Sequence, residues 1–226
     1  MKPRSSNQRS HALTLTEVLV SVAIVCIFAG AAFLMFHRPK VVRRTVLQNQ
    51  SLEMQCEDNL KQIGLAFRIW EGDNGDKLPM HVPAKNGGAM EPALRGNVFQ
   101  VFQVMSNELS TPRILLCPAD ADRFAAKNFT AGFDNSRVSY FAGLDAADDK
   151  PAMFLAGDDN FSIDGRSVKS GLLLLATNAP VSWTAARHVN QGNIGLADGS
   201  VQTTTSSSLR QRLVQTGVAT NRLAIP

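Results

Sequence analysis

The longest apolar stretch of the chain runs from Leu13 to Phe36, close to its beginning. It reads LTLTEVLVSVAIVCIFAGAAFLMF, and Glu17 is its only charged residue. A helix rises about 1.5 Å per residue, so this stretch would be roughly 36 Å long, against about 30 Å for the hydrocarbon core of a bilayer. The pattern therefore predicts a membrane-spanning helix over residues 13–36.

A second helical pattern follows Pro39. Apolar residues recur there three or four positions apart, and so would form one stripe along an amphipathic helix. The stripe consists of Leu52, Cys56, Leu60, Ile63, Phe67 and Trp70. Gly72, Asp73 and Asn74 then end the pattern. We predict a stalk helix over residues 37–71, which continues the first helix with a bend at Pro39.

Beyond Gly72, short apolar strings alternate with turn residues, a pattern typical of strands. The expected strands are Arg113–Cys117, Val138–Gly143, Met153–Ala156, Leu172–Thr177, Asn193–Leu196 and Val201–Thr204. The last two flank Asp198-Gly199, a strong hairpin signal. Val98–Met105 fits a short helix or a strand, and Ser207–Thr216 fits a short helix. The predicted fold class is α+β, with the long helix packed on an antiparallel sheet of a globular domain over residues 72–226.

The charge distribution argues against one class of partner. The 226 residues are 44% hydrophobic and 19% charged, which is too apolar for a disordered chain, and the net charge is +4. Five of the 23 basic residues and one of the 19 acidic residues lie in residues 1–40, so the rest of the chain is neutral overall. This balance does not support a nucleic-acid partner, and basic residues that flank an apolar run are typical of membrane targeting.

Glu17 distinguishes among three interpretations of the apolar segment. A carboxylate inside a membrane helix costs about 2.5 to 3.5 kcal/mol, so it usually has a partner. A plain signal anchor, or a secretory signal peptide cut after Ala29-Gly30-Ala31, leaves Glu17 unexplained. An isolated glutamate near a helix end could also extend to the membrane interface.

The third interpretation comes from a resemblance. The stretch from Ala12 to Val20, ALTLTEVLV, resembles the leader junction of type IV prepilins and type II secretion pseudopilins. The resemblance implies that residues 1–12 are a basic leader, which prepilin peptidase removes between Ala12 and Leu13 before methylating the new amine. Glu17 would then neutralise the terminal amine of a neighbouring subunit during assembly.

A second resemblance covers much of the remaining chain. His188 is followed after nine residues by Asp198-Gly199, which looks like the H-X9-DG signature of prepilin-like proteins. The stretches over residues 56–70, 116–120 and 135–140 match the same proteins. Together these stretches imply a pilin-like fold with an H-X9-DG hairpin in the globular domain.

The resemblance implies a structural subunit of a type II secretion pseudopilus or a type IV pilus-like filament. Its partners would be further copies, other pilin-like subunits, prepilin peptidase, the inner-membrane assembly platform and the membrane. The protein would cross the bacterial inner membrane once, with its globular domain in the periplasm. A membrane-anchored or secreted extracytoplasmic binding module that does not polymerise is the alternative.

The three cysteines allow one disulfide. Cys26 lies in the apolar segment without an aqueous partner, which leaves Cys56 and Cys117. If the globular domain lies outside the cytoplasm, these two could form a disulfide worth about 4 kcal/mol. Two buried free thiols are the alternative.

His188 and Asp198 are expected to have a structural role. A hydrogen bond between them would fix the hairpin, with Gly199 supplying a positive φ. Metal binding by His188 with Asp158 and Asp159 is the other hypothesis, which the spacing does not favour.

Neither a cofactor nor an enzyme activity is expected. Residues 158–164 alternate oxygen-bearing side chains, but Ile163 and Lys169 replace the glycine and the acid that a calcium loop requires, so a polar turn is favoured. Some pseudopilins bind calcium in C-terminal loops, and that option stays open without assigned ligands. Cys117, His188 and Asp198 are residue types found in catalytic sites, but they lie in no local nucleophile motif.

Overall fold

A computed structural model describes residues 15–36 and 40–226. The chain divides into two compact units, residues 1–48 and 49–226, and each is considered by itself. The expected leader and the junction of Ala12 with Leu13 lie outside the described residues, as do Pro39 and the side chain of Glu17.

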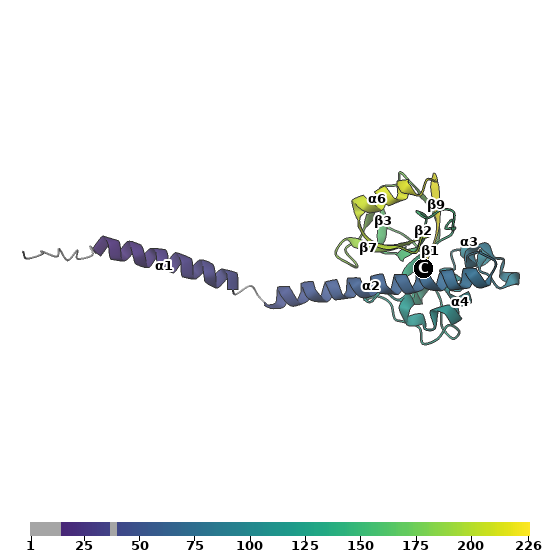
Figure 1. The fold of residues 1–226 in the computed structure, drawn as a ribbon, viewed down its shortest axis with the longest axis horizontal. Helices are drawn as coiled ribbons and strands as arrows, with labels where there is room; N and C mark the ends of the chain where they lie inside the picture. Colours follow the sequence, from purple (N-terminus) through teal and green to yellow (C-terminus); the bar gives the residue numbers. More distant parts are fainter. Residues whose placement is uncertain (1–14, 37–39) are drawn as a thin grey trace, which may run out of the picture. The chain divides into compact units, whose positions relative to one another are not determined.

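The first unit contains helix α1, Leu15–Phe36, and the beginning of helix α2, Lys40–Asp73 (Figure 1). The described side chains of α1 are exposed and mostly apolar, including Leu19, Val25 and Phe28. Among the residues that the structure describes, no helix combines the length and the apolar character that crossing a membrane requires.

The second unit is organised around the C-terminal half of α2. Five residues of the predicted stripe are buried there: Cys56, Leu60, Ile63, Phe67 and Trp70. The helix stops where the backbone N–H of Asn74 donates to the carbonyl of Glu71 and Gly75 takes a positive φ of 67°. The apolar periodicity therefore locates both the buried face of this helix and its end.

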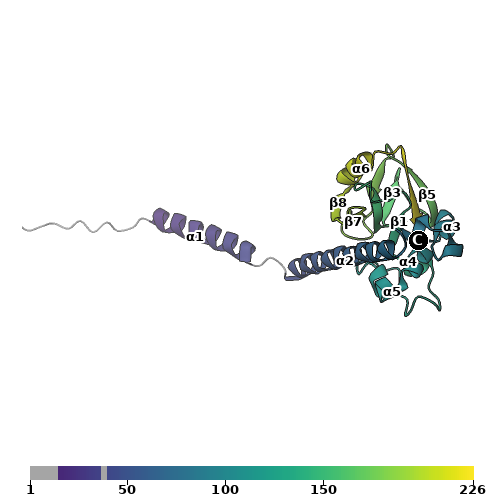
Figure 2. The same ribbon diagram turned by 45° about the vertical axis from the view of Figure 1, so that its right-hand side comes forward.

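Short helical segments cover one side of α2. They are η1 (Pro79–His81), η2 (Ala84–Asn86), α3 (Met90–Leu94), α4 (Val98–Val104), α5 (Ser106–Leu109), η3 (Pro112–Leu115) and η4 (Asn135–Arg137). In Figures 1 and 2, α4 lies across α2 from the strands, and the ring of Phe102 in α4 is 6.1 Å from that of Phe67.

One strand prediction is wrong in this region. Residues 113–117 do not form a strand, because Pro112 begins the 3-10 helix η3 and the hydroxyl of Thr111 accepts a hydrogen bond from the backbone N–H of Arg113. The segment Val98–Met105, which fitted either a helix or a strand, forms helix α4 over Val98–Val104.

Two sheets occupy the other side of α2. The six-stranded sheet has the order β5-β9-β1-β2-β7-β8, and the three-stranded sheet has the order β4-β3-β6. Every pairing recorded between these strands is antiparallel. The strands are β1 (Tyr140–Gly143), β2 (Phe154–Asp158), β3 (Phe161–Ile163), β4 (Arg166–Ser167), β5 (Gly171–Ala176), β6 (Val181–Trp183), β7 (Gln191–Leu196), β8 (Val201–Thr205) and β9 (Thr220–Ile225). The α+β layout predicted for the chain is confirmed.

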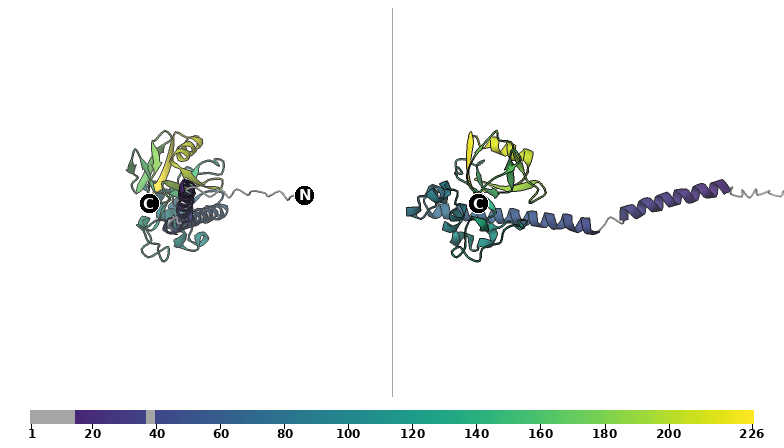
Figure 3. Two further views of the ribbon diagram at one scale, coloured as in Figure 1. Left: turned by 90° about the vertical axis from the view of Figure 1, so that its left-hand side faces the viewer. Right: turned by 180° about the vertical axis from the view of Figure 1, so that it is seen from behind.

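The large sheet separates two apolar cores. Along β1, Tyr140 and Ala142 belong to the core around α2, whereas Phe141 belongs to a second core. That second core lies among the two sheets and helix α6 (Ser206–Gln215), from which Leu209 and Leu213 point inward. Figure 3 shows the strands and α6 on one side of α2 in both of its views. Both faces of the sheet are therefore covered.

The burial of the α2 stripe predicts a sharp contrast between two neighbouring residues. Phe67→Ala should lower the free energy of unfolding of the globular unit by about 3 to 5 kcal/mol, since it leaves a cavity beside Phe102. Leu65→Ala should change it by less than about 0.5 kcal/mol, because Leu65 is 61% exposed on the same helix. Urea unfolding of the full chain, followed by tryptophan fluorescence, measures both. Equal losses in the two variants would contradict the proposed core.

Candidate functional site

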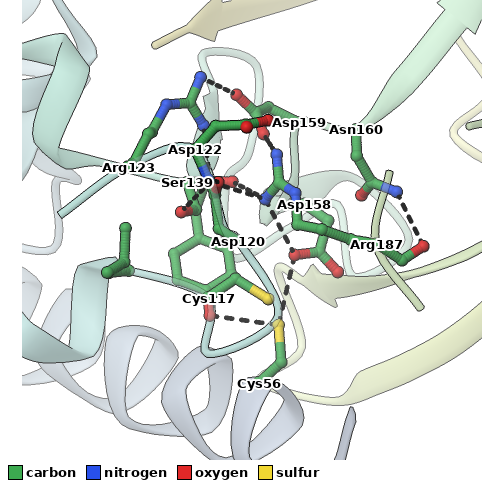
Figure 4. Close-up of polar contacts among 12 residues, drawn as sticks. Cys56, Cys117, Asp120, Asp122, Arg123, Ser139, Asp158, Asp159, Asn160 and Arg187 are labelled. Atoms are coloured by element: carbon green, nitrogen blue, oxygen red, sulfur yellow. Dashed lines mark hydrogen bonds and ion pairs between the residues drawn. The ribbon is translucent and has the colours of Figure 1, made fainter. Parts of the chain in front are cut away.

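Four side chains that can bind a metal meet between α2 and the large sheet. Cys56 lies on α2, Cys117 follows η3, Asp158 ends β2 and His188 precedes β7. One donor atom from each lies within 4.8 Å of the others, and all four residues are buried. Figure 4 shows Cys56, Cys117 and Asp158 converging above the α2 ribbon. We call these four residues the CCDH cluster.

The two thiols are close, but they are not joined. The Cys56 thiol donates to Oδ1 of Asp158 at 3.3 Å, and its Sγ is 3.2 Å from the hydroxyl of Tyr140. The Sγ of Cys117 lies 3.1 Å from Nε2 of His188. The structure thus brings the predicted disulfide partners together as free, buried cysteines, each with a polar partner other than the second sulfur.

Asp158 is positioned by the pairing of β2 with β7. Its Oδ2 accepts hydrogen bonds from the backbone N–H of Asn193 at 2.7 Å and from the side-chain amide of Asn193 at 3.1 Å. These bonds orient the carboxylate, so that Oδ1 faces Cys56. The alternating polar residues after β2 do not form a calcium loop, because Phe161–Ile163 is strand β3.

His188 is held in an unusual backbone segment. His188, Val189 and Asn190 have φ angles of 50°, 52° and 63°, in the left-handed region that β-branched residues such as Val189 rarely adopt. Nε2 of His188 also lies 3.6 Å from Oδ2 of Asp158. Its Nδ1 is buried and has no hydrogen-bond partner among the described residues. This strained loop therefore points the imidazole into the cluster.

The prediction of a hydrogen bond between His188 and Asp198 is wrong. Oδ1 of Asp198 instead accepts from the backbone N–H and the hydroxyl of Ser200, at 2.8 Å and 2.6 Å. Gly199 does have the expected positive φ, at 86°, and the turn joins β7 to β8 as the Asp-Gly pair predicts. Asp198 shapes the turn, whereas His188 belongs to the cluster.

The cluster shifts the acidity of its own members. Hydrogen bonding with Cys56 lowers the pKa of Cys117 to about 5, against the effect of burial, and His188 adds to the decrease. Burial raises the pKa of Asp158 to about 6, and the charge of Cys117 contributes. Burial likewise raises the pKa of Cys56. These shifts favour a state in which Cys117 is a thiolate while Cys56 stays protonated. Ionising several of these groups at once would require additional positive charge nearby.

A network of ion pairs adjoins the cluster. Arg187 pairs with Asp159 and lies 3.6 Å from Asp120, and Arg123 contacts the same two carboxylates at 2.7 Å and 3.2 Å. Arg187 is also 3.9 Å from Asp158, as Figure 4 illustrates. Neither Arg187 nor Asp120 forms a recognisable motif of its own in the sequence. Their position inside or next to the matched stretches was the only available signal.

The cluster has donor types suited to metal binding, and both of its thiols are buried. Cys117 has 0% of its surface exposed, so an attacking thiolate could not reach a substrate in this conformation. Two sulfurs, one carboxylate oxygen and one imidazole nitrogen are all ligand types that bind zinc in proteins. Two neighbouring thiols can alternatively be oxidised to a disulfide.

Comparison with known proteins identifies the beginning of the chain. A family model for the prokaryotic N-terminal methylation motif matches residues 7–33. The chain carries a prepilin-type N-terminus. This motif indicates a prepilin-peptidase substrate of the pilin or pseudopilin kind. The match does not extend to His188 and Asp198. Neither curated proteins nor solved structures gave a match to the chain.

The ion-pair network of this prepilin-type protein predicts a pH-dependent loss in Asp120→Asn. Burial acts to raise the pKa of Asp120, but Arg187 and the 2.7 Å hydrogen bond from Ser139 outweigh it and lower the pKa. Because the pKa of Asp120 is lower in the folded state than in the unfolded state, its ionised carboxylate stabilises the fold at pH values above the unfolded-state pKa. This stabilisation is lost as the pH falls through the folded-state pKa. At neutral pH, the free energy of unfolding of Asp120→Asn should be about 2 kcal/mol lower than that of the wild type. Below about pH 4, the free energies of unfolding of the wild type and the variant should become more similar, because the carboxylate of the wild type becomes protonated.

Urea unfolding of wild type and variant between neutral pH and about pH 3 measures this effect. Asp122→Asn is the matched control, because the Asp122 side chain is exposed two residues away. A loss in Asp120→Asn that does not change with pH would mean that packing, rather than charge, accounts for it.

Proposed function

We propose that the chain is a structural subunit of a type II secretion pseudopilus or a type IV pilus-like filament. The match of residues 7–33 to the methylation motif is the observation that carries this proposal. Prepilin peptidase would cut between Ala12 and Leu13 and methylate the amine of Leu13. Residues 13–36 would then serve as the membrane and assembly helix.

The exposed apolar surface of α1 supports assembly. Val20, Ile27 and Phe28 are 59%, 69% and 71% exposed, and similar apolar residues continue around the helix. A helix with apolar side chains on all sides needs an apolar environment, which a bilayer or a bundle of identical helices supplies. We infer that α1 passes from the inner membrane into the filament, where Glu17 pairs with the terminal amine of a neighbouring copy.

The leader charges support this route. Lys2, Arg4 and Arg9 precede the proposed cut, so the mature chain would be almost neutral. Near-neutral subunits can pack side by side without strong mutual repulsion. The second unit would lie in the periplasm, and the assembly platform and other pilin-like subunits would be its partners.

Prepilin processing and signal-peptide processing would leave different N-termini on the mature protein. The mature protein should begin with N-methylated Leu13, as intact mass and N-terminal peptide mass spectrometry would show. Ala12→Leu should leave the leader attached, because a large side chain replaces the small one at the cut. Ala31→Leu should not change the N-terminus.

The two variants act as controls for each other. An N-terminus at Ala32, abolished by Ala31→Leu and unaffected by Ala12→Leu, would identify a secreted protein. It would favour the binding module that does not polymerise and contradict the proposed subunit.

Glu17 is expected to act in filament assembly and not in folding of the globular unit. Glu17→Ala should reduce incorporation into filaments at least about tenfold, since a loss of some 1.4 kcal/mol per contact already gives that factor. The thermal unfolding of the globular unit should not change, because residues 49–226 form a separate compact unit. Quantitative immunoblotting of sheared filaments, with membrane-bound protein as reference, measures incorporation. Wild-type incorporation would contradict the charge pairing.

A further inference from the structure

We propose that the CCDH cluster is a structural zinc site, with Cys56, Cys117, Asp158 and His188 as the four ligands of one ion. The ion would join helix α2, the segment after η3, strand β2 and the loop before β7. This proposal concerns the globular unit alone and does not depend on filament assembly.

The spacing of the donor atoms fits tetrahedral zinc. Zinc lies about 2.0 Å from nitrogen or oxygen and about 2.3 Å from sulfur, so tetrahedral donors are about 3.3 to 3.8 Å apart. In the cluster, Cys117 Sγ to His188 Nε2 is 3.1 Å and Cys56 Sγ to Asp158 Oδ1 is 3.3 Å. His188 Nε2 lies 3.6 Å from Oδ2, the second oxygen of the Asp158 carboxylate. Shifts of less than about 1 Å would complete the coordination shell.

The donor set favours zinc over calcium. Thiolates and imidazole are preferred ligands of zinc, whereas calcium takes six to eight oxygen ligands. The cluster offers a single carboxylate, and Cys56, Cys117 and Asp158 are completely buried. Four protein ligands in such a place make a closed site, typical of structural rather than catalytic zinc.

The surroundings of the cluster resemble the outer shell of a metal site. Asn193 binds Oδ2 of Asp158 through two donors and leaves Oδ1 directed at Cys56. The hydroxyl of Tyr140 lies 3.2 Å from the Sγ of Cys56 and could donate to a thiolate there. Such contacts orient ligands and raise metal affinity.

Charge gives a further argument. Two thiolates and one carboxylate bound to a divalent zinc ion carry a net charge of −1, and the Arg187 guanidinium lies 3.9 Å from Asp158. Without an ion, the same buried groups must share protons or bear unpaired charge, which is costly. With the ion, binding through Nε2 assigns the His188 proton to Nδ1.

Zinc and the Cys56–Cys117 disulfide exclude each other. Oxidation would remove two electrons and two protons from the thiols and leave Asp158 and His188 as the remaining donors. It would require an external thiol oxidant, such as a disulfide-exchange protein. Two contacts favour zinc: the Cys56 sulfur lies 3.3 Å from Oδ1 of Asp158, and the Cys117 sulfur lies 3.1 Å from Nε2 of His188.

Zinc content of the full-length protein, purified in detergent after expression in zinc-supplemented medium, tests the proposal. Elemental mass spectrometry should find about one zinc per chain. Cys117→Ser and His188→Gln should each reduce that content at least about tenfold. Cys26→Ser and His81→Gln are the matched controls and should retain it, because Cys26 lies on α1 and His81 binds the carbonyl of Leu144 outside the cluster.

A folded wild-type protein that lacks zinc and takes up no added Zn²⁺ after reduction would overturn the proposal. So would a mass loss of about 2 Da, assigned to a Cys56–Cys117 disulfide, in protein that remains zinc-free after reduction and refolding. Zinc retained by both ligand variants would likewise overturn it.

Two further measurements keep all four ligands in place and so do not depend on whether a ligand variant folds. In the wild type, Cys56 and Cys117 should react with iodoacetamide at least about tenfold faster after a zinc chelator is added, while Cys26 should not change. Asn193→Ala keeps all four ligands and should weaken zinc affinity by about 10- to 100-fold. Asn135→Ala, which removes an amide bonded to the carbonyl of Gly96, should leave it unchanged. Equal affinity in both variants would contradict the proposed site.

Discussion

The burial of one stripe of helix α2 is the constraint on which the globular unit depends. Cys56, Ile63 and Phe67 are completely inaccessible, so this helix contacts packed residues along several turns. An exposed helix would gain little from its own backbone bonds, because most helical stability comes from packing. Here the stripe joins the short helices, through Phe102, to the sheet, through Tyr140. The short helices and the sheet therefore pack against the same helix.

The sequence reveals those parts of the fold that local chemistry determines. The α2 stripe and the Asp198-Gly199 hairpin were predictable, since each signal lies within a few neighbouring residues. The apolar string 113–117 misled because Pro112 and Thr111 begin a 3-10 helix there. Strand β9 was missed, because its place between β5 and β1 depends on pairings across the whole domain.

Individual residues of the candidate site could be predicted from the sequence, but their meeting in one cluster could not. The cysteine inventory pointed to Cys56 and Cys117, and the resemblance pointed to His188. Asp158 was paired with His188 only in the metal hypothesis that the spacing did not favour, and no local pattern could choose Asp158 over Asp198 as the carboxylate beside His188. That choice depends on two non-local facts, namely the β2–β7 pairing that carries Asp158 inward and the left-handed loop that turns His188 toward it. Arg187 was missed because its partners lie on separate segments of the chain.

The cluster lies where separate parts of the chain must be held together. Asp158 and Cys56 are far apart in sequence, yet their side chains touch directly between the sheet and α2. An apolar pair would stabilise the same place by burial, but without directional bonds it would not fix the orientation of the helix on the sheet. Directional bonds between polar side chains do fix the orientation of the helix on the sheet. In the proposed filament subunit, the joint between stem and globular core would have to resist rotation to transmit load, and four converging polar side chains resist rotation better than apolar contact alone.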